Sequence, residues 1–351
     1  MKDSSARAMR ALAFVLATAS AAIAAAQVRA QAPAQTTTQT TTQTPAQVRA
    51  QPDRATLDYR LKARALADGV YVVEGANADF SPANGCNIIN TGFIVTGAGV
   101  VVVNTGPSKR YGEQLRALIA QTTAEPVVRV LHLNLHPDYF LGNQAFADVP
   151  RAATARTAAG MKREARAYED NLYRLCGDWM KGTEALLPNA AAEPGVLRVG
   201  ARELELRELR GHTDSDLVLL DRRSGVVFAG GLVFAERVPT TPHAELAPWL
   251  DSLQALAKSE PRVLVPSHGP LSAATAVDAA RAIDQTRRYL QWLDATLKSA
   301  AERGWDMADL LRAPVPEEFR RWAAFDTEFT RNVAHLYPRY ERAALRPGRQ
   351  P

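Results

Sequence analysis

Apolar runs typical of buried strands are the feature that most constrains the fold of this chain. Residues 100–103 read VVVV, and a run without alternation predicts a strand that is buried on both faces. Other strand-like segments lie at 69–75, 87–96, 127–133, 196–200, 203–209, 216–221, 226–234 and 262–266. Helical patterns lie at 108–121, 155–180 and 249–256. This order predicts an α/β fold, an αββα sandwich in which two mixed sheets lie inside and helices flank them.

The first 55 residues are expected to lie outside the folded domain. Lys2, Arg7 and Arg10 precede an apolar run at 11–26 that ends in small residues, which is typical of a cleaved signal peptide over the first 26 residues. An uncleaved N-terminal anchor is the alternative. Residues 27–55 are rich in Gln, Thr, Ala and Pro, which predicts a disordered linker. We therefore expect a periplasmic or secreted protein with no membrane span after signal cleavage.

Two further regions follow the linker. Residues 56–271 hold the strand pattern and are expected to form the layered domain, while 272–351 are mostly helical and are expected to form a C-terminal extension packed on it. The net charge is +5, and basic residues are interspersed with acidic ones, which argues against nucleic-acid binding.

Cys86 and Cys176 are the two cysteines of the chain. In an oxidising compartment they could form a disulfide. Two buried or free thiols are the alternative, and the sequence separation does not decide between them. The cysteines have no CxxC spacing and therefore do not predict a structural zinc site.

Three of the six histidines follow strand-like segments, in loops that contain Gly or Pro. His136 lies in NLHPDYFLGN, His212 in RGHTDSD and His268 in PSHGP, and Asp138 lies two residues after His136. Functional side chains of layered α/β proteins gather at such strand ends. Imidazole is the commonest metal ligand, and a carboxylate often joins it. These four residues are the candidate metal ligands, and we identify no separate cofactor-binding residue.

The motifs NLHPDYFLGN, GHTDSDLVLL, VVFAGGLVF and VPSHGP, in this order, resemble the metallo-beta-lactamase-fold superfamily over most of 69–270. The phrases FLGNQAF and NTGPSKRYGEQLRALI further resemble the zinc metallohydrolases of the quinoprotein relay group. The resemblance implies the metallo-beta-lactamase fold. It also implies an exported protein that works beside a quinoprotein dehydrogenase or its electron carrier.

The metal motif of that superfamily is incomplete in this sequence. Its ligand positions fall, in order, on Asn134, His136, Asp138, Tyr139, His212, Gly231 and His268. The neutral amide of Asn134 is a poor zinc donor. Tyr139 would ligate only as a phenolate, and the ordinary phenol pKa is about 10. Gly231, at the place of the bridging Asp, has no side chain. A tight two-metal site is therefore not expected.

Two functions stay open. The first is a metal-dependent hydrolase with an impaired or mononuclear site, in which one zinc ion is held by some of the four candidate ligands and acts on an unknown small molecule. Asp138 would then orient the attacking water and accept its proton. The second is a non-catalytic binding or accessory protein that retains the fold. The sequence does not name a substrate, and analogy of fold does not supply one.

Other polar residues near these motifs have simpler interpretations. His132 could replace a missing ligand only if the strand slipped by two residues, about 6.6 Å, so a buried packing role is favoured. Asp214 and Asp216 could donate a carboxylate, but shaping the loop after His212 is favoured. His243 is in a loop that could border the site and is expected to be exposed. His335 is expected to pack or to face solvent.

Overall fold

Two β-sheets form the inside of the fold in this computed structural model, which describes residues 51–271 and 274–345. The first has seven strands in chain order, from β1 to β7, and the second has five strands in the order β12-β11-β10-β9-β8. The strands are β1 (Arg64–Ala67), β2 (Val70–Val73), β3 (Thr91–Val95), β4 (Val100–Val103), β5 (Val127–Leu131), β6 (Arg151–Ala153), β7 (Ala190–Ala191), β8 (Gly195–Val199), β9 (Arg202–Leu209), β10 (Asp216–Asp221), β11 (Val226–Phe228) and β12 (Val263–Val265). The predicted signal peptide, and the predicted linker as far as residue 50, lie outside the described residues.

Both sheets are mixed. In the first sheet β1 to β4 pair antiparallel and β4 to β7 pair parallel. In the second sheet only β11 and β12 are parallel. The β3–β4 hairpin turns at 97–99, as the Gly-Ala-Gly sequence predicts. The predicted strand at 226–234 ends at Phe228, because the chain turns at Gly230 with a φ of 56°.

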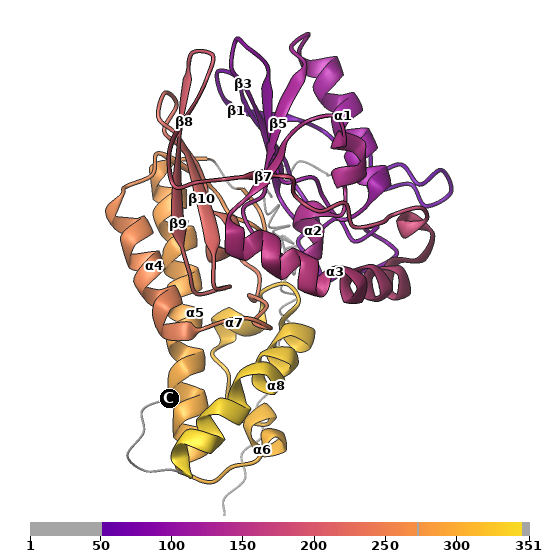
Figure 1. The fold of residues 1–351 in the computed structure, drawn as a ribbon. Coiled ribbons are helices and arrows are strands. Elements are labelled where there is room, and N and C mark those ends of the chain that lie inside the picture. The colour runs from indigo at the N-terminus through magenta and orange to yellow at the C-terminus, as the bar shows by residue number, and fades with distance from the viewer. Residues whose placement is uncertain (1–50, 272–273, 346–351) are drawn as a thin grey trace, which may run out of the picture. The chain divides into compact units, whose positions relative to one another are not determined.

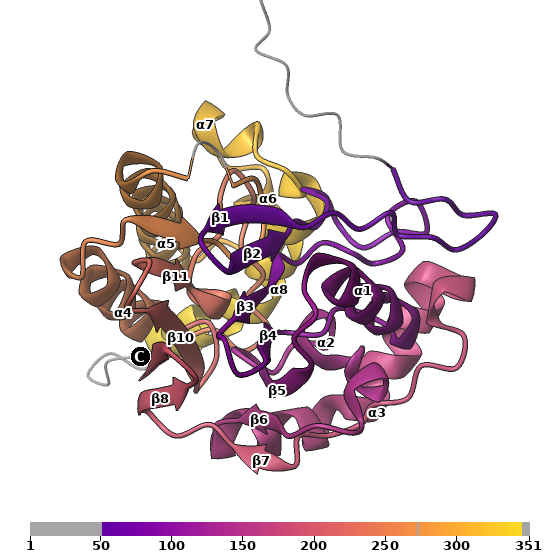
Figure 2. The same ribbon diagram turned by 90° about the horizontal axis from the view of Figure 1, so that it is seen from above.

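Helices flank both sheets (Figures 1 and 2). Their bounds are α1 (Lys109–Thr122), α2 (Pro137–Phe140), α3 (Ala155–Cys176), α4 (Leu246–Lys258), α5 (Ala276–Glu302), α6 (Met307–Leu311), α7 (Glu317–Arg320) and α8 (Phe325–Ala344), with 3-10 turns at Asn143–Phe146, Gly177–Met180 and Gly230–Leu232. α1 and α3 lie beside the first sheet, and α4 and α5 lie beside the second. The predicted αββα sandwich is therefore confirmed.

Strand β4 shows why its sequence is apolar without alternation. Val100 and Val102 pack in the same cluster as Leu115 of α1, whereas Val101 and Val103 pack between the two sheets against residues such as Leu217. All four valines are fully buried. A strand with helices on one face and a second sheet on the other needs apolar side chains on both faces.

Side-chain caps determine where two of the long helices begin. Ser108 accepts a hydrogen bond from the backbone N–H of Tyr111 at the start of α1, and Thr154 accepts one from Thr157 at the start of α3. Such caps satisfy backbone N–H groups that have no partner within the helix. The predicted helix at 108–121 therefore agrees with α1 to within one residue.

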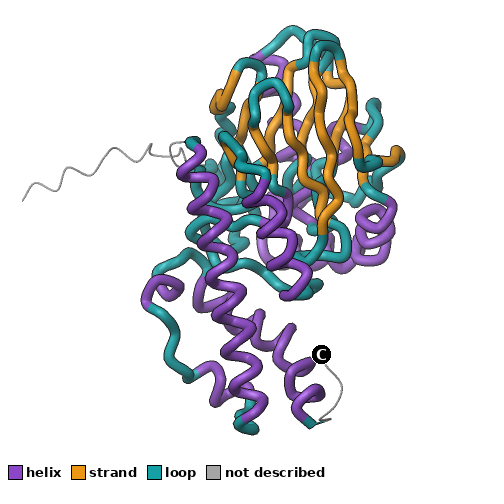
Figure 3. The backbone as a smooth tube through the Cα atoms, turned by 90° about the vertical axis from the view of Figure 1, so that its left-hand side faces the viewer, coloured by secondary structure: helices purple, strands orange, loops and turns teal. Residues whose placement is uncertain are grey.

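The C-terminal helices extend beyond the strands, as Figure 3 shows. α5 and α8 pack through a buried cluster that includes Tyr289, Leu293, Val333 and Leu336. The predicted helical extension is confirmed over its described part, 274–345. Within the described residues, no helix combines the length and the apolar character needed to cross a membrane.

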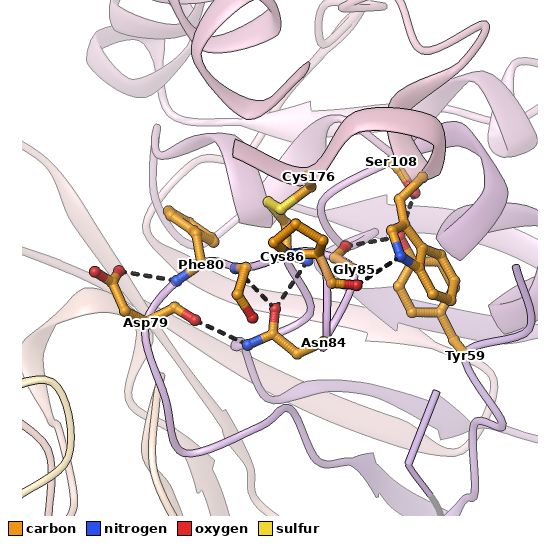
Figure 4. The surroundings of a disulfide bond; sticks show 11 residues. Tyr59, Asp79, Phe80, Asn84, Gly85, Cys86, Ser108 and Cys176 are labelled. Atoms are coloured by element: carbon orange, nitrogen blue, oxygen red, sulfur yellow. Dashed lines mark hydrogen bonds between the residues drawn. A yellow bond between two sulfur atoms is a disulfide. The ribbon is translucent and has the colours of Figure 1, made fainter. Parts of the chain in front are cut away.

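A disulfide joins Cys86 to Cys176, whose Cα atoms lie 5.9 Å apart (Figure 4). It connects the loop after β2 to the last residue of α3. Beside it, the Asn84 side chain accepts a hydrogen bond from the backbone N–H of Cys86, and the hydroxyl of Tyr59 donates to the carbonyl of Gly85. Of the two alternatives that the sequence left open, the structure has the disulfide.

Candidate functional site

The four candidate ligands are brought together at the ends of strands from both sheets. His136 and Asp138 follow β5, as the N-cap residue and in the first turn of α2. His212 lies between β9 and β10. His268 follows β12, and its backbone forms bridges to Ile89 on one side and to Phe234 on the other. All four side chains are buried. Their positions agree with the sequence-based prediction of a shared site, while their role as metal ligands stays a prediction.

Asp138 and His268 form a buried hydrogen bond. Asp138 Oδ2 lies 2.8 Å from His268 Nε2, and the other ring nitrogen lies 2.9 Å from Ser267 Oγ. Phe234 stacks on the imidazole at 4.9 Å between ring centroids. Burial lowers the pKa of His268, and the hydrogen bond to Asp138 opposes that shift. The carboxylate of Asp138 and the imidazole of His268 are therefore each other's buried hydrogen-bond partners.

His136 has a partner that the sequence did not predict. Its Nε2 lies 3.1 Å from Nδ1 of His243, and the two ring centroids are 5.3 Å apart. The His243 side chain is 26% exposed, so it is partly buried at the border of the site and not fully exposed as expected. Burial is the main cause of a pKa of His136 well below its ordinary value, and the neighbouring histidines add to this shift.

The position of His243 comes from a contact between two loops. The backbone N–H of Glu245 donates to the carbonyl of Gly211 at 2.8 Å, which joins the start of α4 to the loop of His212. Gly211 has a φ of 133°, and a Cβ at this position would lie 2.2 Å from the Cα of Trp249. Only glycine permits this close approach. The TTPHAEL segment has no recognisable ligand motif, so the sequence placed His243 only in a loop that could border the site and did not pair it with His136.

The side-chain amide of Asn134 forms hydrogen bonds with other groups of the protein. Its amide nitrogen donates to Asp216 Oδ1 at 2.6 Å and lies 3.3 Å from His212 Nδ1. Its amide oxygen accepts the backbone N–H of His136 at 3.0 Å. Two N–H groups of this amide face three acceptors, because Thr213 Oγ1 also lies 3.3 Å away. If His212 Nδ1 accepts from the amide, a singly protonated ring carries its proton on Nε2 and has no free nitrogen for a metal ion. If Nδ1 instead donates to Asp216 Oδ1, 3.5 Å away, Nε2 is the free nitrogen.

The predicted role of Asp216 in shaping the loop after His212 is confirmed. Its carboxylate accepts the backbone N–H of Thr213 at 2.9 Å as well as the amide of Asn134. Asp214 is exposed. Neither carboxylate replaces a missing metal ligand.

Gly231 lies where a bridging carboxylate would be needed, and no space for a side chain is left there. A Cβ at this position would lie 2.0 Å from Nδ1 of His212 and 2.8 Å from the amide nitrogen of Asn134. The imidazole of His212 therefore fills the volume that a side chain at position 231 would take.

Tyr139 and His132 are fully buried beside the site. Burial, followed by the charge of Asp138, raises the pKa of Tyr139 well above its ordinary value, so the side chain is a phenol and not a phenolate ligand. His132 Nδ1 donates to the carbonyl of Tyr139 at 3.2 Å, and burial lowers the pKa of His132 to about 3. His132 is a packed residue inside the fold, as the sequence favoured.

Within residues 51–271 and 274–345, no three His, Cys, Asp or Glu side chains are arranged to hold an ion. The Nε2 atom of His212 is buried and has no hydrogen-bond partner. It is the one polar atom among the four candidate ligands that is left in this state within the described residues.

Comparisons with known proteins agree with the architecture. The family model of the metallo-beta-lactamase superfamily matches residues 84–268. A metallo-beta-lactamase from Pontibacter korlensis is similar in structure, with a TM-score of 0.52 and 23% identity over 66% of this chain and 99% of that one. Metallo-beta-lactamase IND-7 has a TM-score of 0.50 and 18% identity over 64% and 98% of the two chains. The chain has no significant match among curated proteins.

Proposed function

We propose that this chain, which belongs to the metallo-beta-lactamase superfamily, is an accessory or binding protein that keeps the fold of these hydrolases but does not carry out two-metal hydrolysis. The contact between Gly231 and the imidazole of His212 carries this proposal. Two neighbouring cations need a bridging negative charge to offset their repulsion. At the position where the superfamily motif has that charge, this chain has a glycine packed against a ring.

The remaining side chains support the same function. Asp138 and His268 pair with each other, and the amide of Asn134 bonds Asp216, Thr213 and the backbone of His136. A metal ion would have to replace several of these buried hydrogen bonds. Each contributes about 0.5 to 1.5 kcal/mol net, and this loss would reduce the gain from metal binding.

We also propose that the protein is exported to the periplasm or secreted. The predicted signal peptide at 1–26 supports this location. The disulfide between Cys86 and Cys176 supports it as well, because structural disulfides persist in oxidising compartments and are rare in the reducing cytosol of most organisms.

The proposed partner is a quinoprotein dehydrogenase or its electron carrier. The resemblance of 104–119 and 140–146 to the quinoprotein relay group supports this proposal. It can be tested by measuring the affinity of the purified protein for a quinoprotein dehydrogenase and its cytochrome by biolayer interferometry. Saturable binding is expected, and no binding to either protein would contradict the proposed partner.

A single-zinc hydrolase acting on a small molecule is the second candidate function. The buried and unpartnered Nε2 of His212 favours it, because a polar atom in that state is costly unless something binds it. In this function His136, Asp138, His212 and His268 would supply the ligands, and Asp138 would also act on water. It requires the ring of His212 to carry its proton on Nδ1 instead.

Metal content and hydrolysis distinguish the two functions. The protein, produced without affinity-tag histidines, is dialysed against zinc, and bound metal is measured by elemental mass spectrometry beside turnover of a chromogenic cephalosporin. Fewer than two zinc ions per chain and no zinc-dependent turnover are expected. Two ions per chain with zinc-dependent turnover would overturn the accessory function. One ion with turnover that His268→Ala and Asp138→Asn abolish would establish the single-zinc hydrolase.

A further inference from the structure

The imidazoles of His136 and His243 face each other at the edge of the candidate site. Nδ1 of His243 lies 3.1 Å from Nε2 of His136. His136 is 5% exposed, while His243 reaches solvent, so the pair connects the buried interior to the outside. His243 is not at any of the ligand positions that the superfamily motif assigns.

The separation of the two nitrogens suits a shared metal ion. Imidazole nitrogens bind transition metals at about 2.0 to 2.1 Å. If the angle between two ligand nitrogens at the metal lies between the square-planar and the tetrahedral value, the two nitrogens are about 2.9 to 3.4 Å apart. The observed 3.1 Å lies within this range.

Two acidic residues lie near the outer imidazole. The Glu164 carboxylate lies 4.0 Å from Nε2 of His243, the ring nitrogen on the far side from His136, and it accepts a hydrogen bond from Arg163 at 2.9 Å. Ligating histidines commonly direct their second nitrogen at a carboxylate, which orients the ring and raises its basicity. Asp214 adds a second negative charge near His243, and Arg163 opposes the two acids.

We propose that His136 and His243 form a two-imidazole site for one exchangeable transition-metal ion, with Glu164 orienting His243. Cu²⁺ is the probe of choice, because it is bound most tightly by nitrogen ligands among the divalent first-row metals. Two protein ligands are fewer than a tightly held ion requires, so the other coordination positions belong to water or to a donor group from another molecule. The site is independent of the accessory function, since it uses neither Gly231 nor the Asp138–His268 pair.

A hydrogen bond between the two rings is the competing explanation of the same distance. In that case one ring donates to the other, and an added metal ion would have no preference for this pair. The chain has six histidines, and His132, His212 and His268 are buried, which leaves His335 as the exposed alternative. His335 lies in α8 and interacts electrostatically with His243, so it provides a matched control.

The test is a titration of the purified protein, without affinity-tag histidines, with Cu²⁺. Isothermal titration calorimetry gives the affinity, and pulsed electron paramagnetic resonance counts the imidazoles bound to copper. One copper with two imidazole ligands is expected. His243→Gln and His136→Gln should each weaken binding at least tenfold and leave one imidazole or none, while His335→Gln should change the affinity less than twofold.

Several results would overturn the site. These are no copper binding, unchanged affinity in His243→Gln, or an equal loss in His335→Gln. Retained binding in His243→Gln that disappears in His212→Gln would instead place the ion at the positions of the superfamily motif. Because His243 is partly exposed, its variant is expected to fold, and the thermal melting curve checks this. Glu164→Gln should weaken copper binding by a smaller factor, since it changes only the orientation of His243.

Discussion

At the scale of single residues, His212 is held by groups that the superfamily's ligand set does not contain. Its ring lies against the backbone of Gly231, within hydrogen-bond distance of Asn134 and 5.0 Å from the ring of Trp249. Each contact fixes the imidazole in an orientation that leaves no room at position 231. Position 231 is therefore a glycine because the packed ring of His212 leaves no space for a side chain.

Gly231→Ala should lower the free energy of unfolding by about 1 to 3 kcal/mol, because an added methyl group overpacks the contact with His212. Urea denaturation measures the loss. In a His212→Ala background the same substitution should cost much less, because the ring that it meets is gone. Equal costs in both backgrounds would show that the His212 contact does not determine the residue at 231.

A second prediction at this scale concerns pH and His132. Its pKa is about 3 in the folded protein and about 6.5 in the unfolded chain, so the unfolded state binds more protons between these values. The free energy of unfolding should therefore fall as the pH drops from about 6.5 towards 3, by up to about 1.4 kcal/mol per pH unit for this residue.

Urea denaturation at several pH values between 6 and 4 measures that slope. His132→Gln should reduce the slope, whatever it does to the stability at neutral pH. His335→Gln is the control and should reduce the slope less, since His335 is exposed. An unchanged slope in His132→Gln would show that this residue does not stay neutral in the folded protein.

At the scale of the elements, the disulfide ties α3 to the loop after β2. It closes a sequence separation of 90 residues, and its loss should cost about 2 to 5 kcal/mol. Chemical denaturation with and without reductant should show this difference. A variant with Cys86→Ser and Cys176→Ser should unfold at the same midpoint in both conditions. A wild-type midpoint that stays constant while free thiols form would contradict the prediction.

Helix α8 is joined to the layered domain by a buried ion pair. Arg237 is 1% exposed and its guanidinium lies 3.8 Å from the carboxylate of Glu328 in α8. It also donates to the carbonyl of Ala78, and it lies near enough to Asp138 for the two charges to interact. The C-terminal extension is therefore coupled to the candidate site through charge.

Glu328→Gln should leave the buried guanidinium of Arg237 without its carboxylate and lower the free energy of unfolding by about 3 to 5 kcal/mol. Arg237→Met should cost less, because the Glu328 carboxylate still accepts a hydrogen bond from Arg331 at 3.0 Å. The double variant should lose less than the sum of the two, which urea denaturation of all four proteins would show. Strict additivity would mean that the two charges do not interact.

At the scale of the whole molecule, location and disulfide chemistry should change together. When the full chain is produced in a bacterium with an oxidising periplasm, intact-mass spectrometry should find a form shortened by about 26 residues, in agreement with the length of its predicted signal. Thiol titration of that form should find no free cysteine. A chain that lacks residues 2–26 should stay in the cytoplasm with both thiols free. Retention of the full-length mass would contradict export by a cleaved signal.

The layered fold could be predicted because most of its elements have local signals. The run at β4 predicted burial on both faces, and Gly-Ala-Gly predicted the β3–β4 turn. β6 and β7 could not be predicted, because they are two or three residues long with the sequences RAA and AA. Such short segments are strands only because a neighbouring strand pairs with them.

The sequence by itself determined the αββα architecture with two sheets, the helical extension and the four candidate ligands, because apolar periodicity and short motifs are properties of neighbouring residues. Only the tertiary structure decided which groups meet. His243 reaches His136 across 107 positions, Cys86 pairs with Cys176, and the ring of His212 fills the space beside Gly231. These contacts depend on how the loops between strands pack. Short motifs in the sequence identify the side chains that could bind metal. The packing of the loops determines which of these side chains form hydrogen bonds with each other.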